Sequence, residues 1–482
     1  MDVRDENESE MKTILSIILA VLPNIFPDYA GVTIPRNIAP LNFSIQEEAT
    51  VYKATFSSGI HSFRVYSLNG NINVPERKWK ALLSGDSDEI TVETAVLIKG
   101  RWNSREPFRI YVSSDPIDDY IAYRLIPPGY EVWGSMGIYQ RCLSSYEQTA
   151  VAENRLMGDN CMNCHSFANR RPDRFMFHMR STYDGTYILK DKAIEKINTK
   201  TPETISSLVY PQWSTDGRYI AFSVNDIAQV FHSRDSNRVE VFDYSSDVVV
   251  YDVENHNIIF SPLTKSPDYF ETFPCFSPDG KSLYFCSAKA IKEMPERYRE
   301  VKYNIMRIDF NPATGRFGDR LETVYDAASE DKSASFPRIS PDGRLLLFTL
   351  HGYGNFSIWH KDADLCLMDL GDKSLRPLVP FNSKDVESYH SWSSDGRWVV
   401  FSSRRDDGLY TKLYIGHIDA DGNASKPFLL PQKNPKEFYL RLMYSYNIPE
   451  FVTGKIQAKP SDFAEIAIES PGIDISSGHP AP

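Results

Sequence analysis

The chain has 482 residues, which is enough for two or three domains. Its formal net charge of −11 argues against nucleic acid as a partner, because no basic face would offset phosphate repulsion. A hydrophobic content of 41% and a charged content of 24% are ordinary for a folded soluble protein, and 13% aromatic residues favour β structure. Six cysteines are too few for a disulfide scaffold.

The first 30 residues predict an N-terminal extension followed by an export signal. Residues 1–10 are polar and acidic, and from Met11 a lysine precedes the apolar run 14–22. This run has the length of a secretory signal and is too short to span a bilayer. An apolar N-terminal strand is the alternative, since residues 28–30 make a poor cleavage site. We expect no membrane span, and association with a membrane surface stays open.

Residues 31–117 predict a small β-sandwich domain. The segments that read as strands, separated by turn signals such as Asn69-Gly70, are 41–45, 61–66, 89–93, 95–98 and 108–112. This stretch contains no catalytic constellation. We therefore interpret it as a module for packing or for docking a partner.

Four copies of one motif organise the second half of the chain. Their Asp-Gly steps begin at Asp216, Asp279, Asp342 and Asp395, which are 63, 63 and 53 residues apart. Asp-Gly suits a tight turn with positive φ between two strands, so each aspartate is interpreted as a turn residue rather than a metal ligand. Four strands per period of about 50–60 residues are typical of a propeller blade.

These S-x-D-G-[KR] units resemble the WD40-like (TolB-type) β-propeller repeat. Weaker strand pairs lie upstream, at 121–126 with 137–141 and at 174–180 with 184–189. The resemblance implies an all-β chain with a propeller of about six four-stranded blades over 118–446, with five or seven blades as alternatives. Residues 447–482 are rich in Pro, Ser and Gly and are expected to form an extended C-terminal tail.

The segment Cys161-Met162-Asn163-Cys164-His165 reads C-x-x-C-H, the spacing at which a c-type haem is attached. Two thiols at this spacing add to the vinyl groups of one porphyrin, and the imidazole of His165 becomes the proximal iron ligand. A zinc half-site and a redox cysteine pair are the alternatives. Zinc would need a second C-x-x-C or a histidine pair at suitable spacing, and a redox pair would need a βαβ context. The sequence offers neither. We therefore predict one haem c, carried by a short insert at 147–174 with one or two helical turns.

The sixth iron ligand is predicted to be His178, with Met176 as the alternative. In a strand these two side chains and Arg180 share one face. Met157, Met179 and an open, water-bearing position also remain candidates. Equally, His178 reads as a strand residue bonded to a neighbouring carbonyl.

Arginines follow the motif closely, and Arg170 and Arg174 are the predicted ligands of the haem propionates. Guanidinium binds carboxylate through two parallel hydrogen bonds, which suits this role. A solvated basic loop is the alternative interpretation.

The combination of C-x-x-C-H with these repeats resembles a group of exported bacterial propeller proteins that carry one haem c site. The resemblance implies a periplasmic or cell-envelope protein that transfers electrons to, or senses redox state with, a partner protein. The alternative is an envelope interaction scaffold in which the haem is structural. An enzyme ranks third, because the chain has no G-x-S-x-G elbow, Gly-rich phosphate loop or H-E-x-x-H. Nothing in the sequence brings His351, His360 and His390 together.

Overall fold

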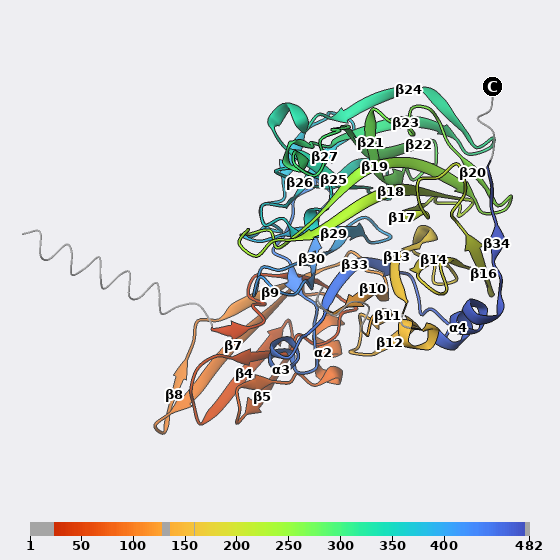
Figure 1. The fold of residues 1–482 in the computed structure, drawn as a ribbon. Helices are drawn as coiled ribbons and strands as arrows, with labels where there is room; N and C mark the ends of the chain where they lie inside the picture. The colour runs from red at the N-terminus through yellow and green to blue at the C-terminus, as the bar shows by residue number, and fades with distance from the viewer. Residues whose placement is uncertain (1–23, 128–134, 159, 478–482) are drawn as a thin grey trace, which may run out of the picture. The chain divides into compact units, whose positions relative to one another are not determined.

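The computed structural model describes residues 24–127, 135–158 and 160–477 (Figure 1). The chain divides into two compact units, which are described separately. Unit 1 holds residues 24–116, 144–146 and 426–442, and unit 2 holds the other described residues. The apolar run of the expected export signal lies outside the described residues. Within the described ranges, no helix is long and apolar enough to cross a bilayer.

Unit 1 contains two β-sheets and two short helices. The larger sheet has the order β2 (Thr33–Pro35), β9 (Phe108–Ser113), β7 (Glu89–Ile98), β4 (Val51–Ser58) and β5 (His61–Ser67), with β8 (Arg101–Ser104) paired to β7. The smaller sheet has the order β1 (Ile25–Phe26), β3 (Phe43–Ile45) and β6 (Asn71–Ile72). The helices are α2 (Glu76–Leu83) and α3 (Pro435–Leu440), and the short strand β32 spans Phe428–Leu429. In β4 burial alternates residue by residue, as expected for a strand with one face on a core.

Two features of unit 1 differ from the sequence-based expectation. The predicted strands 89–93 and 95–98 form one continuous strand, β7, because Thr94 pairs with Ala54 without interrupting the ladder. The unit also recruits residues 144–146 and 426–442, so it does not coincide with 31–117. For example, the Asn42 side chain donates to the carbonyl oxygen of Lys433 at 2.9 Å, a contact between segments far apart in sequence.

Unit 2 is all-β and propeller-like, built from successive sheets that are antiparallel except where β34 and β35 add in parallel (Figure 1). One sheet has the order β12 (Gln148–Glu153), β11 (Gly137–Cys142), β10 (Tyr120–Ile126) and β33 (Ser445–Val452). The next contains β13 (Cys161–Phe167), β14 (Arg174–Arg180), β15 (Gly185–Lys190), β16 (Ala193–Asn198) and β34 (Ile473–Asp474). A third contains β17 (Val209–Trp213), β18 (Tyr219–Phe231), β19 (Val239–Asp252), β20 (Asn257–Ile259) and β35 (Ser476–Ser477).

Three further sheets follow the third. They comprise β21 (Tyr269–Phe276), β22 (Ser282–Lys289), β23 (Asn304–Asn311) and β24 (Arg316–Tyr325), then β25 (Ser333–Ile339), β26 (Leu345–His351), β27 (Asp364–Asp369) and β28 (Leu375–Pro377), then β29 (Glu387–Trp392), β30 (Trp398–Ser403) and β31 (Lys412–His417). Strand β13 neighbours β17, and the series continues through β21, β25 and β29 to β33, which in turn neighbours β13. These six strands therefore surround a common axis, and we call them the first strands, although β33 is the last strand of its sheet in the sequence.

The repeated aspartates occupy the same turn in each copy, as the sequence predicts. Ser277 Oγ donates to Asp279 Oδ1 at 2.6 Å, and the Lys281 backbone N–H donates to the same oxygen at 3.0 Å. The same pair of hydrogen bonds recurs around the other three aspartates, Asp216, Asp342 and Asp395. Gly280 follows with φ 69°, a conformation that glycine adopts without steric cost. The four aspartates are thus turn residues.

Two predicted segments differ in the structure. Over the described residues 147–158 and 160–174 the expected insert is replaced by strands: β12 and β13 belong to adjacent sheets, and a 3₁₀ turn at Asn154–Met157 lies between them. Residues 445–452 form β33, which pairs with β10, so the predicted tail at 447–482 begins inside a sheet. It continues through the helix α4 (Pro460–Glu469), whose Phe463 packs against Phe175 and Phe177. The apolar face of α4 explains why the segment is ordered despite its composition.

Candidate functional site

The first strand of each sheet around the axis contains one non-glycine residue with a positive φ. The angles lie between 50° and 53°, and the residues are Cys164, Tyr210, Phe273, Phe336, Tyr389 and Ile448. At each of these positions the ladder register shifts, which marks a β-bulge. A positive φ costs a residue with a Cβ roughly 1–2 kcal/mol, so packing around the axis must hold these residues in place.

The bulge defines a repeated triplet that includes half of the C-x-x-C-H motif. In most copies the residue after the positive φ is proline, and the exceptions are His165 and His390. The third residues of the triplets are Ser166, Gln212, Cys275, Arg338, Ser391 and Glu450. Cys164-His165 therefore takes the place that Phe273-Pro274 takes in another copy. At the position of Cys164 the other triplets carry a large apolar side chain, which is aromatic in every case except Ile448.

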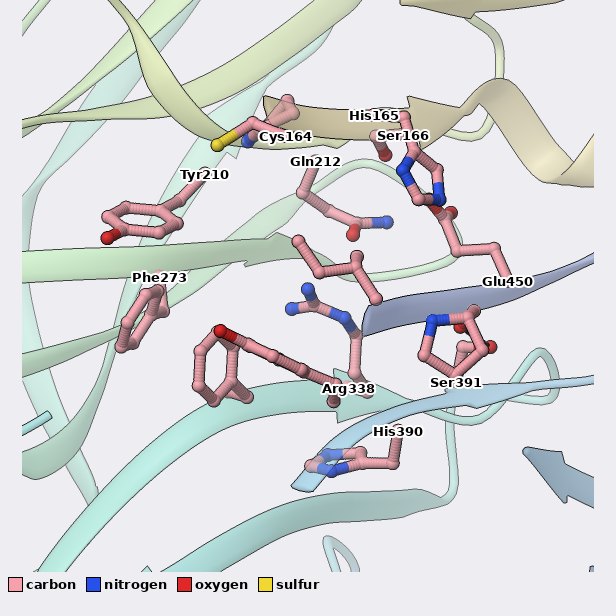
Figure 2. Close-up of a pocket in the computed structure, with 15 residues that line it drawn as sticks. Cys164, His165, Ser166, Tyr210, Gln212, Phe273, Arg338, His390, Ser391 and Glu450 are labelled. Carbon is pink, nitrogen blue, oxygen red and sulfur yellow. Dashed lines mark hydrogen bonds and ion pairs between the residues drawn. The ribbon is translucent and has the colours of Figure 1, made fainter. Parts of the chain in front are cut away.

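The triplets line a small cavity on the axis (Figure 2). Its volume is about 40 Å³, and every first strand contributes to its wall. One side is aromatic: the ring centroids of Tyr210 and Phe273 are 4.7 Å apart, and Phe336 and Tyr389 continue the series at 5.0 Å. The other side is polar and is formed by His165 and by the third residues of three triplets, Ser166, Ser391 and Glu450.

His165 lies in this cavity wall with an unsatisfied imidazole. It is 2% exposed, and neither ring nitrogen has a hydrogen-bond partner among the described residues. Its Nε2 is 3.8 Å from Glu450 Oε1. Burial and the nearby Arg124 charge lower the pKa of His165 to about 3, and the backbone of Ile448 opposes this shift without meeting hydrogen-bond geometry. The imidazole is therefore neutral, the form in which histidine ligates a metal.

The two cysteines of the motif lie in different surroundings. Cys164 is buried and opens on the axial cavity, and burial raises the pKa of its thiol. Cys161 is half-buried, accepts a hydrogen bond from Asn163 Nδ2 at 2.9 Å, and packs against the apolar cluster between β11 and β14. The bulge at Cys164 separates the two environments.

The donor chemistry of the motif fits a c-type haem. Two free thiols flank the dipeptide Met162-Asn163 in an extended strand, and the adjacent neutral imidazole has one lone-pair nitrogen that can bond a metal. The volume does not accommodate a porphyrin as the strand stands, because ligand pockets measure roughly 300 Å³ or more. Cys161 and Cys164 would also have to face one porphyrin together. Attachment of a haem would therefore require residues 161–163 to change conformation.

His178 and Met176, the predicted sixth ligands, lie on β14 away from the axial cavity. His178 is fully buried, its Nδ1 is 3.2 Å from Thr186 Oγ1, and its Nε2 has no hydrogen-bond partner in the part of the chain that the structure describes. It stands directly opposite Asn163 in the ladder. Met176 packs in an apolar cluster with Ile188. The structure gives His165 and His178 different partners and does not bring them together.

The other methionines considered, Met157 and Met179, are buried in the apolar cluster of Phe175 and Phe177. The predicted propionate ligands also separate. Arg170 Nε donates to the carbonyl oxygen of Trp392 at 2.8 Å, and its side chain lines a second cavity on the axis. Arg174 reaches the Asp216 carbonyl oxygen at 3.5 Å and lines neither axial cavity.

The structure assembles a polar cluster that the sequence did not indicate. His351 Nδ1 and His360 Nδ1 are 3.2 Å apart, and His360 Nε2 is 3.0 Å from Glu240 Oε2. Tyr353 donates to Glu240 Oε1 at 2.6 Å. Glu240 belongs to the long hairpin β18–β19, whose strands of 13 and 14 residues extend beyond those of the other sheets. The unusual length of these two strands is the feature from which the position of the cluster could have been predicted.

No family model and no curated protein matches the chain. Prolyl oligopeptidase B from Galerina marginata is 13% identical with a TM-score of 0.34, over 58% of this chain and 39% of that one. Dipeptidyl peptidase 4 from Porphyromonas gingivalis is 12% identical with a TM-score of 0.32, over 70% and 51%. An ancestral GH74 enzyme is 10% identical with a TM-score of 0.33, over 85% and 63%. The chain spans less than two thirds of each of these structures, and likeness this low assigns neither a family nor an activity.

Proposed function

We propose that the protein carries one covalent haem c and exchanges electrons with a partner protein, either as a carrier or as a redox sensor. Cys161 and Cys164 hold the haem by thioether bonds, and His165 ligates the iron. The observation that carries the proposal is the buried, neutral imidazole of His165, which follows a pair of free thiols and has no hydrogen-bond partner among the described residues. Leaving such a group unsatisfied costs about 1–3 kcal/mol, which a ligand bond removes.

The position of β13 supports attachment at this motif. In the ladders of its sheet β13 pairs with β14 alone, so its other edge is free of sheet hydrogen bonds. Ahead of the bulge just three residue pairs join the two strands, beginning at Cys161 with Arg180. Releasing so short a stretch leaves the rest of the sheet intact. The strand can therefore present both thiols to one porphyrin without unfolding the unit.

For the sixth position we propose His178. It faces Asn163 of the motif across the ladder, and no described residue makes a hydrogen bond to its buried Nε2. A carboxylate oxygen of Asp184 lies 3.7 Å from this nitrogen. Two histidine ligands would make a six-coordinate haem that exchanges electrons without binding substrate.

We further infer a closed propeller of six blades as the platform for this haem. The return of β33 to β10, and its position between β29 and β13, support closure by the C-terminal strand. A propeller leaves only short, protected sheet edges, which limits edge-to-edge association. Because haem c is attached outside the cytoplasm, and residues 14–22 have the pattern of an export signal, we place the protein in the periplasm or cell envelope.

A second candidate function is an envelope interaction scaffold. The observation that favours it is the triplet repeat, in which Cys164-His165 occupies the place of an aromatic residue and proline. That equivalence explains the local backbone without any haem. The two candidates differ in one measurable property, the attachment of haem.

The experiment is expression of the full chain with and without a haem-attachment system. Haem that absorbs in the visible and stays with the chain after denaturation and acid extraction supports the electron-transfer function. Added carbon monoxide should leave the spectrum unchanged if His178 fills the sixth position. A colourless protein with titratable thiols at Cys161 and Cys164 would leave the scaffold as the function.

A further inference from the structure

A second cavity of about 120 Å³ lies on the axis beyond the triplet residues. It shares Gln212, Arg338, Ser391 and Glu450 with the aromatic cavity. One water needs about 10–15 Å³ on this scale, so the space holds a small anion together with several waters. The charged residues in its wall are Arg170, Arg338 and Glu450.

The two guanidinium groups of this wall have no carboxylate partner among the described residues. Arg170 Nε donates to the Trp392 carbonyl oxygen, and Arg338 Nη1 donates to the Pro337 carbonyl oxygen, each at 2.8 Å. Each guanidinium has five N–H donors, so most of its hydrogen-bonding capacity remains available. Figure 2 shows Arg338 and Gln212 projecting into the same space between the strands.

Glu450 does not neutralise this wall. Its Oε2 accepts the Phe167 backbone N–H at 3.3 Å, which draws the carboxyl group toward β13. Even with Glu450 ionised, the wall carries one net positive charge. Other carboxylates that act on Arg170 from farther away are Asp118 and Asp395, and these are engaged by Ser394 and by the turn around Ser393.

The backbone at Arg170 adopts a sterically unfavourable conformation. Asn169 and Arg170 have φ of 45° and 61°, a conformation that is unfavourable for side chains with a Cβ. Such strain persists where surrounding contacts hold the backbone in place. One such contact is the hydrogen bond at 2.9 Å from the Thr453 backbone N–H to the carbonyl oxygen of Arg170. This turn holds Arg170, which is half-buried, in the wall of the cavity that Arg338 also lines.

We propose that this cavity binds a small anion, a carboxylate or a phosphate, through the guanidinium groups of Arg170 and Arg338 with the amide of Gln212. Two fork-shaped donors in one wall match the several acceptor oxygens of these anions. The site does not rest on the haem proposal, since its residues are formed by β17, β25, β29 and β33 as well as by the loop after β13.

The test is isothermal titration calorimetry of the full chain, produced in the cytoplasm without a haem-attachment system, with inorganic phosphate and separately with acetate. Sodium chloride at matched ionic strength is the reference for non-specific screening. We expect saturable binding of one of the two anions, and the stronger arm identifies the ligand class. Arg338→Gln and Arg170→Gln should each weaken binding roughly tenfold or more, because each removes charge-assisted hydrogen bonds.

Arg344→Gln is the matched control. This arginine lies on the Asp-Gly turn of the β25–β26 hairpin, where it pairs with Asp369 Oδ2 at 3.1 Å outside the cavity. Binding by this variant should equal that of the wild type. If Arg338→Gln fails to fold by circular dichroism, Arg170→Gln at the cavity mouth decides the question. No saturable binding by the wild type, or equal binding by every variant, would overturn the proposal.

Discussion

The ring of Phe273 stacks on the ring of Phe336, with centroids 3.9 Å apart and planes inclined by 27°. Each ring comes from the bulge of a different first strand, so the contact joins two neighbouring sheets at the axis. Cys164 occupies the corresponding position of β13 and supplies a thiol instead of a ring. The axis is thus aromatic along one arc and carries a thiol and an imidazole along another.

Removing one ring should destabilise unit 2 substantially. Phe336→Ala deletes a buried aromatic side chain whose neighbours on both sides are rings, and truncations of this kind cost about 3–5 kcal/mol. Denaturant unfolding measures the free energy change. Phe231→Ala is the control, because that side chain is 63% exposed and its loss should cost less than about 0.5 kcal/mol. Equal effects of the two substitutions would show that the axial stack contributes no stability.

The proposed sixth ligand is tested by His178→Ala in the haem-loaded protein. Loss of a nitrogen ligand should convert a low-spin spectrum to a high-spin one and open the iron to carbon monoxide. Met176→Leu is the matched control on the same strand, since that side chain packs in an apolar cluster and should leave the spectrum unchanged. If Met176→Leu changes the spectrum and His178→Ala does not, the ligand is the methionine.

The repeated turns make a separate prediction about stability. Asp279→Ala removes the acceptor for Ser277 Oγ and for the Lys281 backbone N–H, which should cost about 1–2 kcal/mol. The exposed Asp319 of the same sheet serves as control, and its replacement by alanine should change stability by less than about 0.5 kcal/mol. The absorption spectrum of bound haem should not respond to either substitution. A spectral change in Asp279→Ala would give this aspartate a role beyond its turn.

A buried acid predicts how stability depends on pH. Burial, and secondarily the charge of Asp247, raise the pKa of Glu271 from 4.5 to about 9. The folded state therefore holds a proton that the unfolded state releases above about pH 4.5. This contribution is complete below pH 4.5 and is lost as pH rises toward 9, by about 1.4 kcal/mol per unit.

Glu271→Gln should remove that dependence. Between pH 6.5 and 8.5 the free energy of unfolding of the wild type should fall by about 2–3 kcal/mol more than that of the variant. The window lies above the pKa of about 6 to which burial raises Asp247, so that neighbour does not contribute to the difference. Urea unfolding at the two pH values measures it, with the exposed Glu254→Gln as control. Parallel pH profiles for wild type and Glu271→Gln would contradict a buried protonated carboxyl group.

Sequence patterns predicted the hairpins well because their information is local. Ser277 and Asp279 lie two residues apart, and the turn they form requires no distant contact. The pairing of β33 with β10 was missed because it joins residues more than 300 positions apart, and the composition of the tail carries no trace of it. The pairing partner of such a strand is determined by the arrangement of the other sheets, and its own residues do not reveal it.

At the candidate site, the sequence identified Cys161, Cys164 and His165 but not their surroundings. The motif was expected on an insert, whereas the strand context follows from a repeat of bulges that is visible in sequence as Phe273-Pro274 and its counterparts. The triplet of His165 lacks the Asp-Gly step that follows four of the other five triplets, so the equivalence was hidden. Glu450 and Arg338 line the site because the strands pack around the axis, and no local sequence pattern predicts this packing.

Covalent attachment of haem is tested most directly by the intact mass of the chain after expression with a haem-attachment system. The wild type should gain the mass of one haem and show thioether-bonded haem in its reduced pyridine spectrum. Cys161→Ser with Cys164→Ser should show the unmodified mass and no colour, while Cys275→Ser, which alters a buried thiol outside the motif, should match the wild type. A wild-type chain of unmodified mass, with both motif thiols free, would contradict the electron-transfer function.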